Sequence, residues 1–305
     1  MFGLLSRSRK PVSSPWRNRA RLGVERLEMR DCPAAPVITS FSVVPLANKM
    51  VNLSGTLTDT NPATTWVNFG GQVQGSVLAD STGHFSAQTS ATSVGTATAI
   101  ATDQAGLTSP SVSAPISVPA PQITLTLTYG TGHQLILSGK VTDNWPNGLT
   151  VKISGLVSGT TTTDASGNFS TTLTANTPNG TIYASTTDSW SLNSNTASVS
   201  ASNTAPVISN LSASGGGLGY WTITGKVTDE HPEGLVVTFS STDVPAVNGQ
   251  KATVQADGTF TLTVIIPSTQ SGYIYAQTTD WWGIQSNLDW TIITQIIGGG
   301  NPTGG

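Results

Sequence analysis

Nine aspartates recur in this sequence in three groups of three, and they are the residues whose type and spacing point most directly to chemistry. The first of each group lies in a TD-x-x-P stretch, the second opens a D-x-x-G-x-F or D-G-x-F turn, and the third lies in a later TD pair. They are Asp59, Asp80 and Asp103, then Asp143, Asp164 and Asp188, and finally Asp229, Asp257 and Asp280. Calcium prefers six to eight oxygen ligands, so three carboxylates at one place, joined by backbone carbonyls, predict a Ca²⁺ site.

A second interpretation of the same aspartates needs no metal. An Asp side chain commonly accepts hydrogen bonds from backbone N–H groups two residues further on, and this fixes a turn. The sequence contains no D-x-D-x-D-G calcium loop. Both hypotheses therefore stay open: a turn-forming role, or binding of Ca²⁺ at an affinity of roughly 10⁻⁴–10⁻³ M, as in extracellular modules.

The spacing of these landmarks shows that the chain is built from three repeats. Equivalent aspartates of the first and second repeats lie 84 or 85 residues apart, and the third repeat is longer because about seven residues enter near STDVPAVNGQ. The repeats also begin alike, with APVITSFSV at Ala35, APQITLTLT at Ala120 and APVISNLSA at Ala205. Repeats of this kind are copies of one structural unit. We expect domains at 35–118, 119–204 and 205–297, after an N-terminal segment at 1–34 and before a flexible Gly-rich tail at 298–305.

Within each repeat the apolar residues alternate with polar ones, which is typical of half-buried strands. The second repeat contains seven such runs, at 122–128, 134–142, 149–155, 159–163, 168–174, 180–187 and 195–201. Seven short antiparallel strands in about 85 residues predict an immunoglobulin-like β-sandwich. The fold class expected for the body is therefore all-β, with three such sandwiches in tandem.

The repeat pattern SG-x-x-TD, D-x-x-G-x-F and A-x-A-x-D-x-x-G-x-x-S resembles that of bacterial Ig-like modules. The match runs through all three repeats, although Ser191 replaces the late Gly in the second. Modules of this kind are common in adhesins and surface stalks, so the resemblance implies an extracellular or cell-surface structural role. A sandwich hosts many functions, so the fold alone does not identify a ligand.

Antiparallel order predicts where the nine aspartates lie. The loops after the second, fourth and sixth strands share one end of a sandwich, because the chain reverses direction at each strand. This is also the end at which the first strand begins, so it faces the preceding domain. We expect all nine carboxylates at this end of their domains, next to the domain junctions.

Four tryptophans are expected in the same loops: Trp145, Trp190, Trp281 and Trp282. Exposed Trp beside Asp and Asn can stack on sugar rings, which predicts a carbohydrate-binding site as one hypothesis. Loop Trp residues also seal the open end of a sandwich or pack against a neighbouring domain. Exposure of these side chains on one shared face would favour the first hypothesis, and their burial at the domain junctions would favour the second. Three others, Trp66, Trp221 and Trp290, lie in or next to expected strands, and we interpret them as packing or surface residues.

The N-terminal segment is strongly basic and we expect it to be disordered. All eight Arg and Lys of the first 34 residues lie between Arg7 and Arg30. The stretch VERLEMRDCPA (24–34) resembles the VE-x-LE-x-R-x-x-PA segment of exported or surface proteins of planctomycete-type bacteria, with Met29 where an Asp is usual. This resemblance implies export or surface sorting; the alternative is an unstructured start of no consequence. Cys32 is the only cysteine, so it permits a disulfide-linked dimer without implying one.

Charge and missing motifs exclude several classes of function. From Ala35 onward there are five Lys and thirteen Asp and Glu, which disfavours nucleic acid as a partner because its phosphates are bound by Lys and Arg. No apolar run approaches the roughly 20 residues of a membrane-spanning helix. No HExxH, GxSxG or Walker motif occurs, so we expect neither an enzyme nor a catalytic residue. The predicted function is a non-catalytic rod that contacts a cell-surface protein or polysaccharide, and the alternative is a carbohydrate-binding accessory module.

Overall fold

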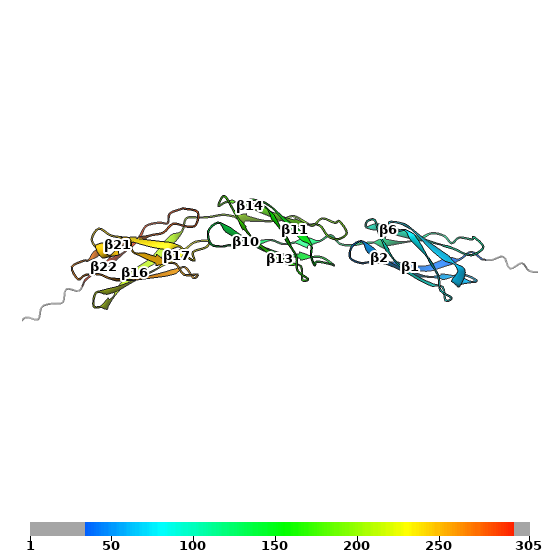
Figure 1. Cartoon of the computed structure of the whole chain (residues 1–305), viewed down its shortest axis with the longest axis horizontal. Helices are drawn as coiled ribbons and strands as arrows, with labels where there is room; N and C mark the ends of the chain where they lie inside the picture. Colours follow the sequence, from blue (N-terminus) through cyan, green and yellow to red (C-terminus); the bar gives the residue numbers. More distant parts are fainter. Residues whose placement is uncertain (1–33, 296–305) are drawn as a thin grey trace, which may run out of the picture.

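The computed structural model describes residues 34–295, which form three β-sandwiches in a row (Figure 1). Apart from strands, these residues form two one-turn 3₁₀ helices, η1 (Pro62–Thr64) and η2 (Pro245–Val247). The predicted all-β class with tandem sandwiches is confirmed. The predicted disordered basic segment and the Gly-rich tail fall outside the described residues, apart from Ala34.

Each domain has the same succession of seven strands, and in the second domain the first of them is split in two. The first domain contains β1 (Val37–Pro45), β2 (Met50–Thr58), β3 (Trp66–Gly71), β4 (Gly75–Leu78), β5 (His84–Ser90), β6 (Gly95–Thr102) and β7 (Val112–Ile116). The second contains β8 (Gln122–Ile123), β9 (Thr126–Tyr129), β10 (Gln134–Thr142), β11 (Thr150–Gly155), β12 (Gly159–Thr162), β13 (Asn168–Thr174), β14 (Gly180–Thr186) and β15 (Ala197–Ala201). The third contains β16 (Val207–Gly217), β17 (Tyr220–Thr228), β18 (Val236–Ser240), β19 (Lys251–Thr253), β20 (Thr259–Ile265), β21 (Gly272–Gln277) and β22 (Asp289–Ile293).

Two antiparallel sheets make up each sandwich, with the same order in all three domains. In the first domain they are β1-β2-β5 and β4-β3-β6-β7. The fourth strand therefore joins the sheet of the third, sixth and seventh strands, a point that the order of strands along the chain leaves open. The physical reason is the short connection from β3 to β4, since antiparallel neighbours can be joined by a tight hairpin.

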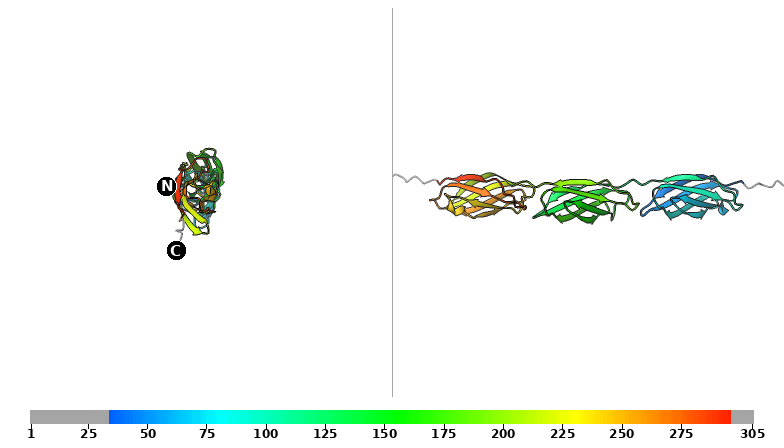
Figure 2. Two further views of the ribbon diagram at one scale, coloured as in Figure 1. Left: turned by 90° about the vertical axis from the view of Figure 1, so that its left-hand side faces the viewer. Right: turned by 90° about the horizontal axis from the view of Figure 1, so that it is seen from above.

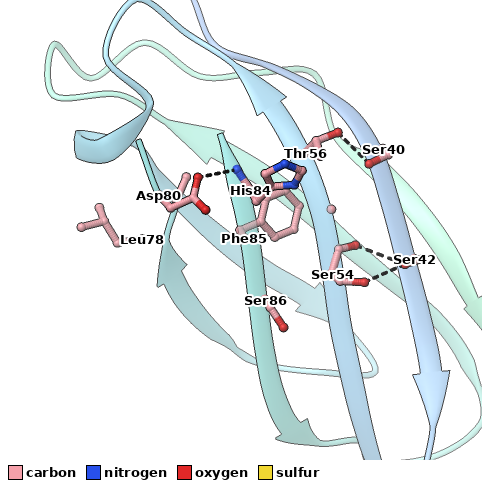
Figure 3. A pocket seen from close by; sticks show the side chains of 11 residues that line it. Ser40, Ser42, Ser54, Thr56, Leu78, Asp80, His84, Phe85 and Ser86 are labelled. Atoms are coloured by element: carbon pink, nitrogen blue, oxygen red, sulfur yellow. Dashed lines mark hydrogen bonds between the residues drawn. The ribbon is translucent and has the colours of Figure 1, made fainter. Parts of the chain in front are cut away.

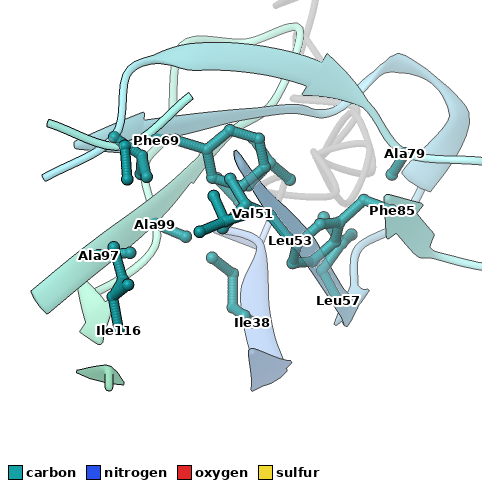
Figure 4. Close-up of a cluster of buried hydrophobic side chains, with 14 of the residues drawn as sticks. Ile38, Val51, Leu53, Leu57, Phe69, Ala79, Phe85, Ala97, Ala99 and Ile116 are labelled. Atoms are coloured by element: carbon teal, nitrogen blue, oxygen red, sulfur yellow. The ribbon is translucent and has the colours of Figure 1, made fainter. Parts of the chain in front are cut away.

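The cores consist of the inward-facing residues of the alternating strands. In the first domain, Val51 and Leu53 of one sheet meet Phe69, Ala97 and Ala99 of the other (Figure 4). The second and third domains have their own clusters of buried apolar side chains. Each repeat thus buries its own apolar surface, as the sequence pattern predicts.

The recurring Gly of the SG-x-x-TD stretch is explained by a close approach of an aromatic ring. A Cβ on Gly139 would lie 2.6 Å from Cζ of Phe169 and 2.0 Å from the carbonyl oxygen of Thr124. In the third domain a Cβ on Gly225 would lie 2.4 Å from Cζ of Phe260. The Gly and the Phe of the repeat signature are therefore one packing unit, and only Gly leaves room for the ring.

The three sandwiches follow one another in a line (Figures 1 and 2). The nine-residue strands β2, β10 and β17 each span about 30 Å. Three domains end to end therefore make a rod on the order of 100 Å long. Between residues 34 and 295 there is no helix with the length and apolar character needed to cross a membrane.

Candidate functional site at the domain junctions

The first junction is organised by Trp190, which lies in the loop between β14 and β15 of the second domain. Its side chain is only 2% exposed and belongs to the apolar cluster of the first domain. The indole N–H donates a hydrogen bond of 2.8 Å to the backbone oxygen of Leu46, in the loop between β1 and β2. Beside it, the backbone N–H of Asn48 donates to Oγ of Ser189, and Trp145 packs against the same cluster. The loops of the second domain thus close the end of the first.

The second junction repeats this arrangement with different partners. Trp282, at the position equivalent to Trp190, packs against the core of the second domain. Its ring stacks on the imidazole of His133, with centroids 3.9 Å apart and planes 2° apart. Nε2 of His133 also donates a hydrogen bond of 3.0 Å to the backbone oxygen of Trp281. The same loop of each following domain therefore reaches the same end of the preceding one.

The linker between the second and third domains is held by acidic side chains. Nδ2 of Asn203 donates to Oδ2 of Asp280 at 2.7 Å. The backbone N–H and the hydroxyl of Thr204 both donate to Oε1 of Glu230, at 3.0 and 2.7 Å. These bonds add polar restraints to the aromatic stack at this junction.

The first domain lacks the aromatic residue at the corresponding loop position. Ala105 stands where the following domains carry Trp190 and Trp282. Together with Gln104 and the predicted site residues Asp59 and Asp103, it lines a shallow hollow of about 140 Å³. Oδ2 of Asp59 accepts a hydrogen bond from the hydroxyl of Thr65. Asp59 and Asp103 of this domain therefore line one hollow, but without the aromatic side chain.

The middle aspartate of each group is a turn former. Oδ1 of Asp164 accepts hydrogen bonds of 2.8 Å from the backbone N–H groups of Ser166 and Asn168. Oδ1 of Asp80 accepts from the backbone N–H groups of Thr82 and His84 and from the Thr82 hydroxyl. Oδ1 of Asp257 accepts from the backbone N–H and the hydroxyl of Thr259. These hydrogen bonds hold the pKa of all three exposed carboxyls below the usual range. The turn hypothesis describes these three residues fully.

Five of the other six aspartates also bond to their own loops through Oδ1, whereas Asp59 does so through Oδ2. Asp188 accepts from the backbone N–H groups of Trp190 and Leu192, and Asp280 accepts from those of Trp282 and Ile284. Asp103 accepts from Leu107, Asp143 from Trp145, and Asp229 from His231. The aspartate thus fixes the loop that carries the junction tryptophan.

Several oxygens in these loops are buried without a hydrogen-bond partner. They include Oδ2 of Asp143 and of Asp188 near the first junction, and Oδ2 of Asp229 and Oε2 of Glu230 near the second. Asp188 is only 8% exposed. Buried polar atoms are rarely left unpaired, because losing hydration without a partner costs free energy. These atoms are therefore the places where a cation would be held best.

Electrostatic strain is evident at Asp229. Burial raises the pKa of this carboxyl, and the neighbouring charges of Glu230 and Asp280 raise it further. The hydrogen bond from the His231 backbone acts in the opposite direction but does not outweigh them. Acidic groups of two different loops thus lie close enough here to repel one another.

Calcium binding by all nine aspartates is not what the geometry favours. Among residues 34–295, no group of three or more His, Cys, Asp or Glu side chains is arranged to hold a metal ion. The three turn-forming aspartates use their oxygens for their own loops. The calcium hypothesis is therefore reduced to the junction pairs Asp143 with Asp188 and Asp229 with Asp280, and their binding of calcium remains a prediction.

The predicted carbohydrate site loses one of its four tryptophans. Trp190 was one of the four loop tryptophans of that hypothesis, and its burial against the first domain leaves no face for a sugar ring. Trp145, Trp281 and Trp282 are half-buried, and the indole N–H of Trp281 is used by the backbone oxygen of His231. The junction role is the one that the contacts of these side chains favour.

A hollow of about 780 Å³ on the first domain contains Ser, His and Asp side chains without a catalytic arrangement (Figure 3). Asp80 accepts a hydrogen bond from the backbone of His84, not from its imidazole. The hydroxyls of Ser42 and Ser54 bond to each other across the strands. A nucleophile needs a base within hydrogen-bond reach, and no such pair is formed by these residues.

Comparison with known proteins found similarity to solved structures at low TM-scores. No family model matches the chain, and no curated protein matches it. Similar solved structures include fibronectin(III)-like modules of Clostridium thermocellum CbhA, at 20% identity over 54% of this chain and 92% of that one, with a TM-score of 0.23. Others are the central fibronectin-III array of RIM-binding protein (12%, 86% and 98%, TM-score 0.26) and the BSP domain of a biofilm associated protein (12%, 89% and 68%, TM-score 0.25). At these TM-scores no functional conclusion is based on them.

Two junction residues, His133 and Leu46, could not be identified from their residue type or from a motif. His133 stacks on a ring 149 residues further along, and the Leu46 backbone oxygen bonds a side chain 144 residues away. Their only sequence signal is their place in the loop after the first strand, at the end of the sandwich opposite the aspartates.

Proposed function

We propose that this chain is an extracellular or cell-surface spacer, a stiff non-catalytic rod that holds a contact site away from the surface where it is anchored. The observation that carries this proposal is the burial of Trp190 in the end of the preceding domain, with a matching stack of Trp282 on His133. Junctions packed by aromatic side chains restrict the angle between domains, whereas bare linkers would let the domains move independently. Residues 1–34 supply the export or sorting signal in this proposal.

Surface display is tested in cells that make the full chain. We expect an externally added protease to digest it on intact cells, and removal of residues 1–34 to leave it protected inside. A cytoplasmic marker protein controls for lysis. Protection of the full chain on intact cells would contradict the proposal.

We further propose that Ca²⁺ stiffens the two junctions through Asp143 with Asp188 and through Asp229 with Asp280. Support comes from the buried Oδ2 atoms of Asp143, Asp188 and Asp229, which have no partner, and from the pKa of Asp229, which burial raises and the charges of Glu230 and Asp280 raise further. A divalent cation would satisfy these oxygens and cancel the repulsion, with backbone carbonyls completing its shell. The polar linker contacts of Asn203 and Thr204 would remain in place.

Calorimetry and thermal melting test the calcium proposal. With millimolar Ca²⁺ at about ten times Kd, we expect a stabilisation of about 1–2 kcal/mol. A variant combining Asp143→Asn and Asp188→Asn should lose the response of the first junction, whereas Asp164→Asn, in an exposed turn, should keep it. No heat of binding and an unchanged melting temperature would refute it.

A further inference from the structure

The outer face of β21 and β22 in the third domain carries a cluster of exposed apolar side chains, whereas the equivalent positions of the other two domains are mostly small and polar. Trp290 is 56% exposed, Leu288 54%, Ile292 50% and Tyr273 44%. Tyr275 is half-buried beside them. Across the two strands Tyr273 pairs with Ile292 and Tyr275 with Trp290, and the rings of Tyr273 and Trp290 pack edge to face at 5.2 Å. These five side chains, which we name the β21–β22 patch, form one continuous surface.

The equivalent positions show that the sandwich does not need this patch. On the last strand, Leu288, Trp290 and Ile292 correspond to Thr196, Ser198 and Ser200 of the second domain and to Ser111, Ser113 and Pro115 of the first. On the preceding strand, Tyr273 and Tyr275 correspond to Thr181 and Tyr183, and to Thr96 and Thr98. Two domains of the same chain thus fold with mostly small polar residues there. The apolar residues of the third domain serve something other than its fold.

We propose that the β21–β22 patch is the contact surface for a second copy of this chain, so that two rods associate side by side through their third domains. Half-exposed side chains of roughly 150–250 Å² each give the patch on the order of 400 Å² of apolar surface. A stable interface buries about 800 Å² per partner. Somewhat more than half of that is apolar, so the patch supplies about the apolar share of one standard interface.

Because the patch has no charged side chain, it is a surface through which two acidic copies can meet with little repulsion. The described domains carry thirteen Asp and Glu against five Lys, so two copies repel one another over most of their surface. None of the five patch side chains is charged. Two patches related by a two-fold axis therefore meet where like charge is absent, and a two-fold contact uses the same surface on both copies. Face-to-face packing of two sheets, with their side chains interdigitating, is a common way to bury such a surface.

A polysaccharide fits the patch less well. Sugar sites combine exposed ring faces with hydrogen-bonding groups, whereas aliphatic side chains, Leu288 and Ile292, flank the rings here. Edge-to-face packing also uses one ring of the Tyr273–Trp290 pair to support the other. Protein contact surfaces, in contrast, are enriched in Trp and Tyr.

Sedimentation velocity of the full chain, with a reductant to prevent a disulfide through Cys32, tests the proposal. We expect a monomer–dimer equilibrium that ammonium sulfate strengthens. The variant Trp290→Ser with Ile292→Ser installs the residues of the second domain and should weaken the dimer at least tenfold in Kd. Trp66→Ser, at a 50% exposed Trp of the first domain, is the matched control and should leave Kd unchanged. Equal melting temperatures of the variants confirm that they are folded.

Four results would overturn the proposal. The first is a native chain that stays monomeric at all accessible concentrations. The second is a dimer that Trp290→Ser with Ile292→Ser does not weaken. The third is a dimer that forms only after removal of residues 296–305. The fourth is retention of the native chain on cellulose or chitin that is lost in the double variant. Either of the last two would assign the patch to another occupant.

Discussion

The indole of Trp190 crosses the boundary between two domains, because its backbone belongs to the second while its ring packs against the core of the first. The loop that presents it is fixed by Asp188, whose Oδ1 accepts the backbone N–H of Trp190 itself. The recurring aspartate is thus a positioning residue for the aromatic side chain two residues on. The repeat keeps both features in the third domain, with Asp280 and Trp282.

Replacing Trp190 should separate the contributions of packing and hydrogen bonding. We expect Trp190→Ala to cost about 3 kcal/mol of unfolding free energy, because it leaves a cavity at the end of the first domain. Trp190→Phe keeps most of the packing but loses the hydrogen bond to the backbone oxygen of Leu46. This loss should lower the free energy of unfolding by about 1 kcal/mol, in addition to the effect of the smaller ring. Guanidinium unfolding measures both. The control Trp66→Ala should cost less, and equal costs for Trp66 and Trp190 would contradict the assignment.

Asp229 predicts an unusual dependence of stability on pH. Its pKa is raised in the folded state, so its contribution to stability is present at low pH and is lost as the pH rises through the raised pKa. Asp229→Asn removes the charge but keeps an oxygen for the His231 N–H. We therefore expect this variant to have a higher melting temperature than the native chain at pH 7 without calcium, by a margin that shrinks on acidification.

Asp257 supplies the control of opposite sign. Its pKa is lowered by hydrogen bonds from Thr259, so its contribution is present at neutral pH and is lost as the pH falls through the lowered pKa. Asp257→Asn should therefore lower the melting temperature at pH 7. If Asp229→Asn and Asp257→Asn shift the melting temperature at pH 7 in the same direction, the repulsion inferred at Asp229 is wrong.

At the scale of strands and loops, the domain is a repeated unit whose two ends differ. One end carries the loops with the aspartates, and the other carries the loop after the first strand, which receives the next domain. The pairing of Gly139 with Phe169 and of Gly225 with Phe260 holds the middle of the first sheet together in each copy. The regular spacing of these residues in the three repeats thus reflects both the packing within each domain and the geometry of the junctions.

Replacing these glycines should show how closely the ring and the backbone approach. Gly139→Ala meets both Phe169 and a backbone oxygen, whereas at Gly225 the three nearest atoms all belong to the Phe260 ring, which can shift. We expect losses of about 1–3 kcal/mol for Gly225→Ala and a larger loss for Gly139→Ala. Thermal unfolding of the two variants measures these losses of stability. A smaller loss for Gly139→Ala than for Gly225→Ala would contradict the argument.

The strands were largely predictable from the sequence, whereas the junction contacts were not. Alternation located β10 and β13 at their observed bounds, because a half-buried strand shows its period directly. Alternation cannot show which sheet the fourth strand joins, because the sequence of β12 would show the same alternating pattern in either of the two sheets. The end of the sandwich that holds Asp188 follows from strand order, but the partner of Trp190 does not. That partner, Leu46, is 144 residues away and is brought close only by the packing of whole domains.

The whole molecule is a line of three domains whose connections are packed rather than open. At each connection an aromatic ring of the following domain lies against the apolar cluster of the preceding one. The β21–β22 patch lies on the third domain, so association through it would join two copies at that domain, and the packed junctions would restrict how far the first domain can move relative to the contact.

The most direct test of this account is the distribution of distances between a spin label on the first domain of the full chain and a second label on either the second or the third domain. Cys32 is replaced by Ser, and cysteines are introduced at exposed Ser111 and Thr196 in one pair and at Ser111 and Thr253 in another. We expect a single narrow distance for each pair, and broad distributions once Trp190 and Trp282 are both replaced by Ala. Broad distributions in the native chain, or narrow ones that survive both replacements, would contradict the claim that these two side chains hold the domains in line.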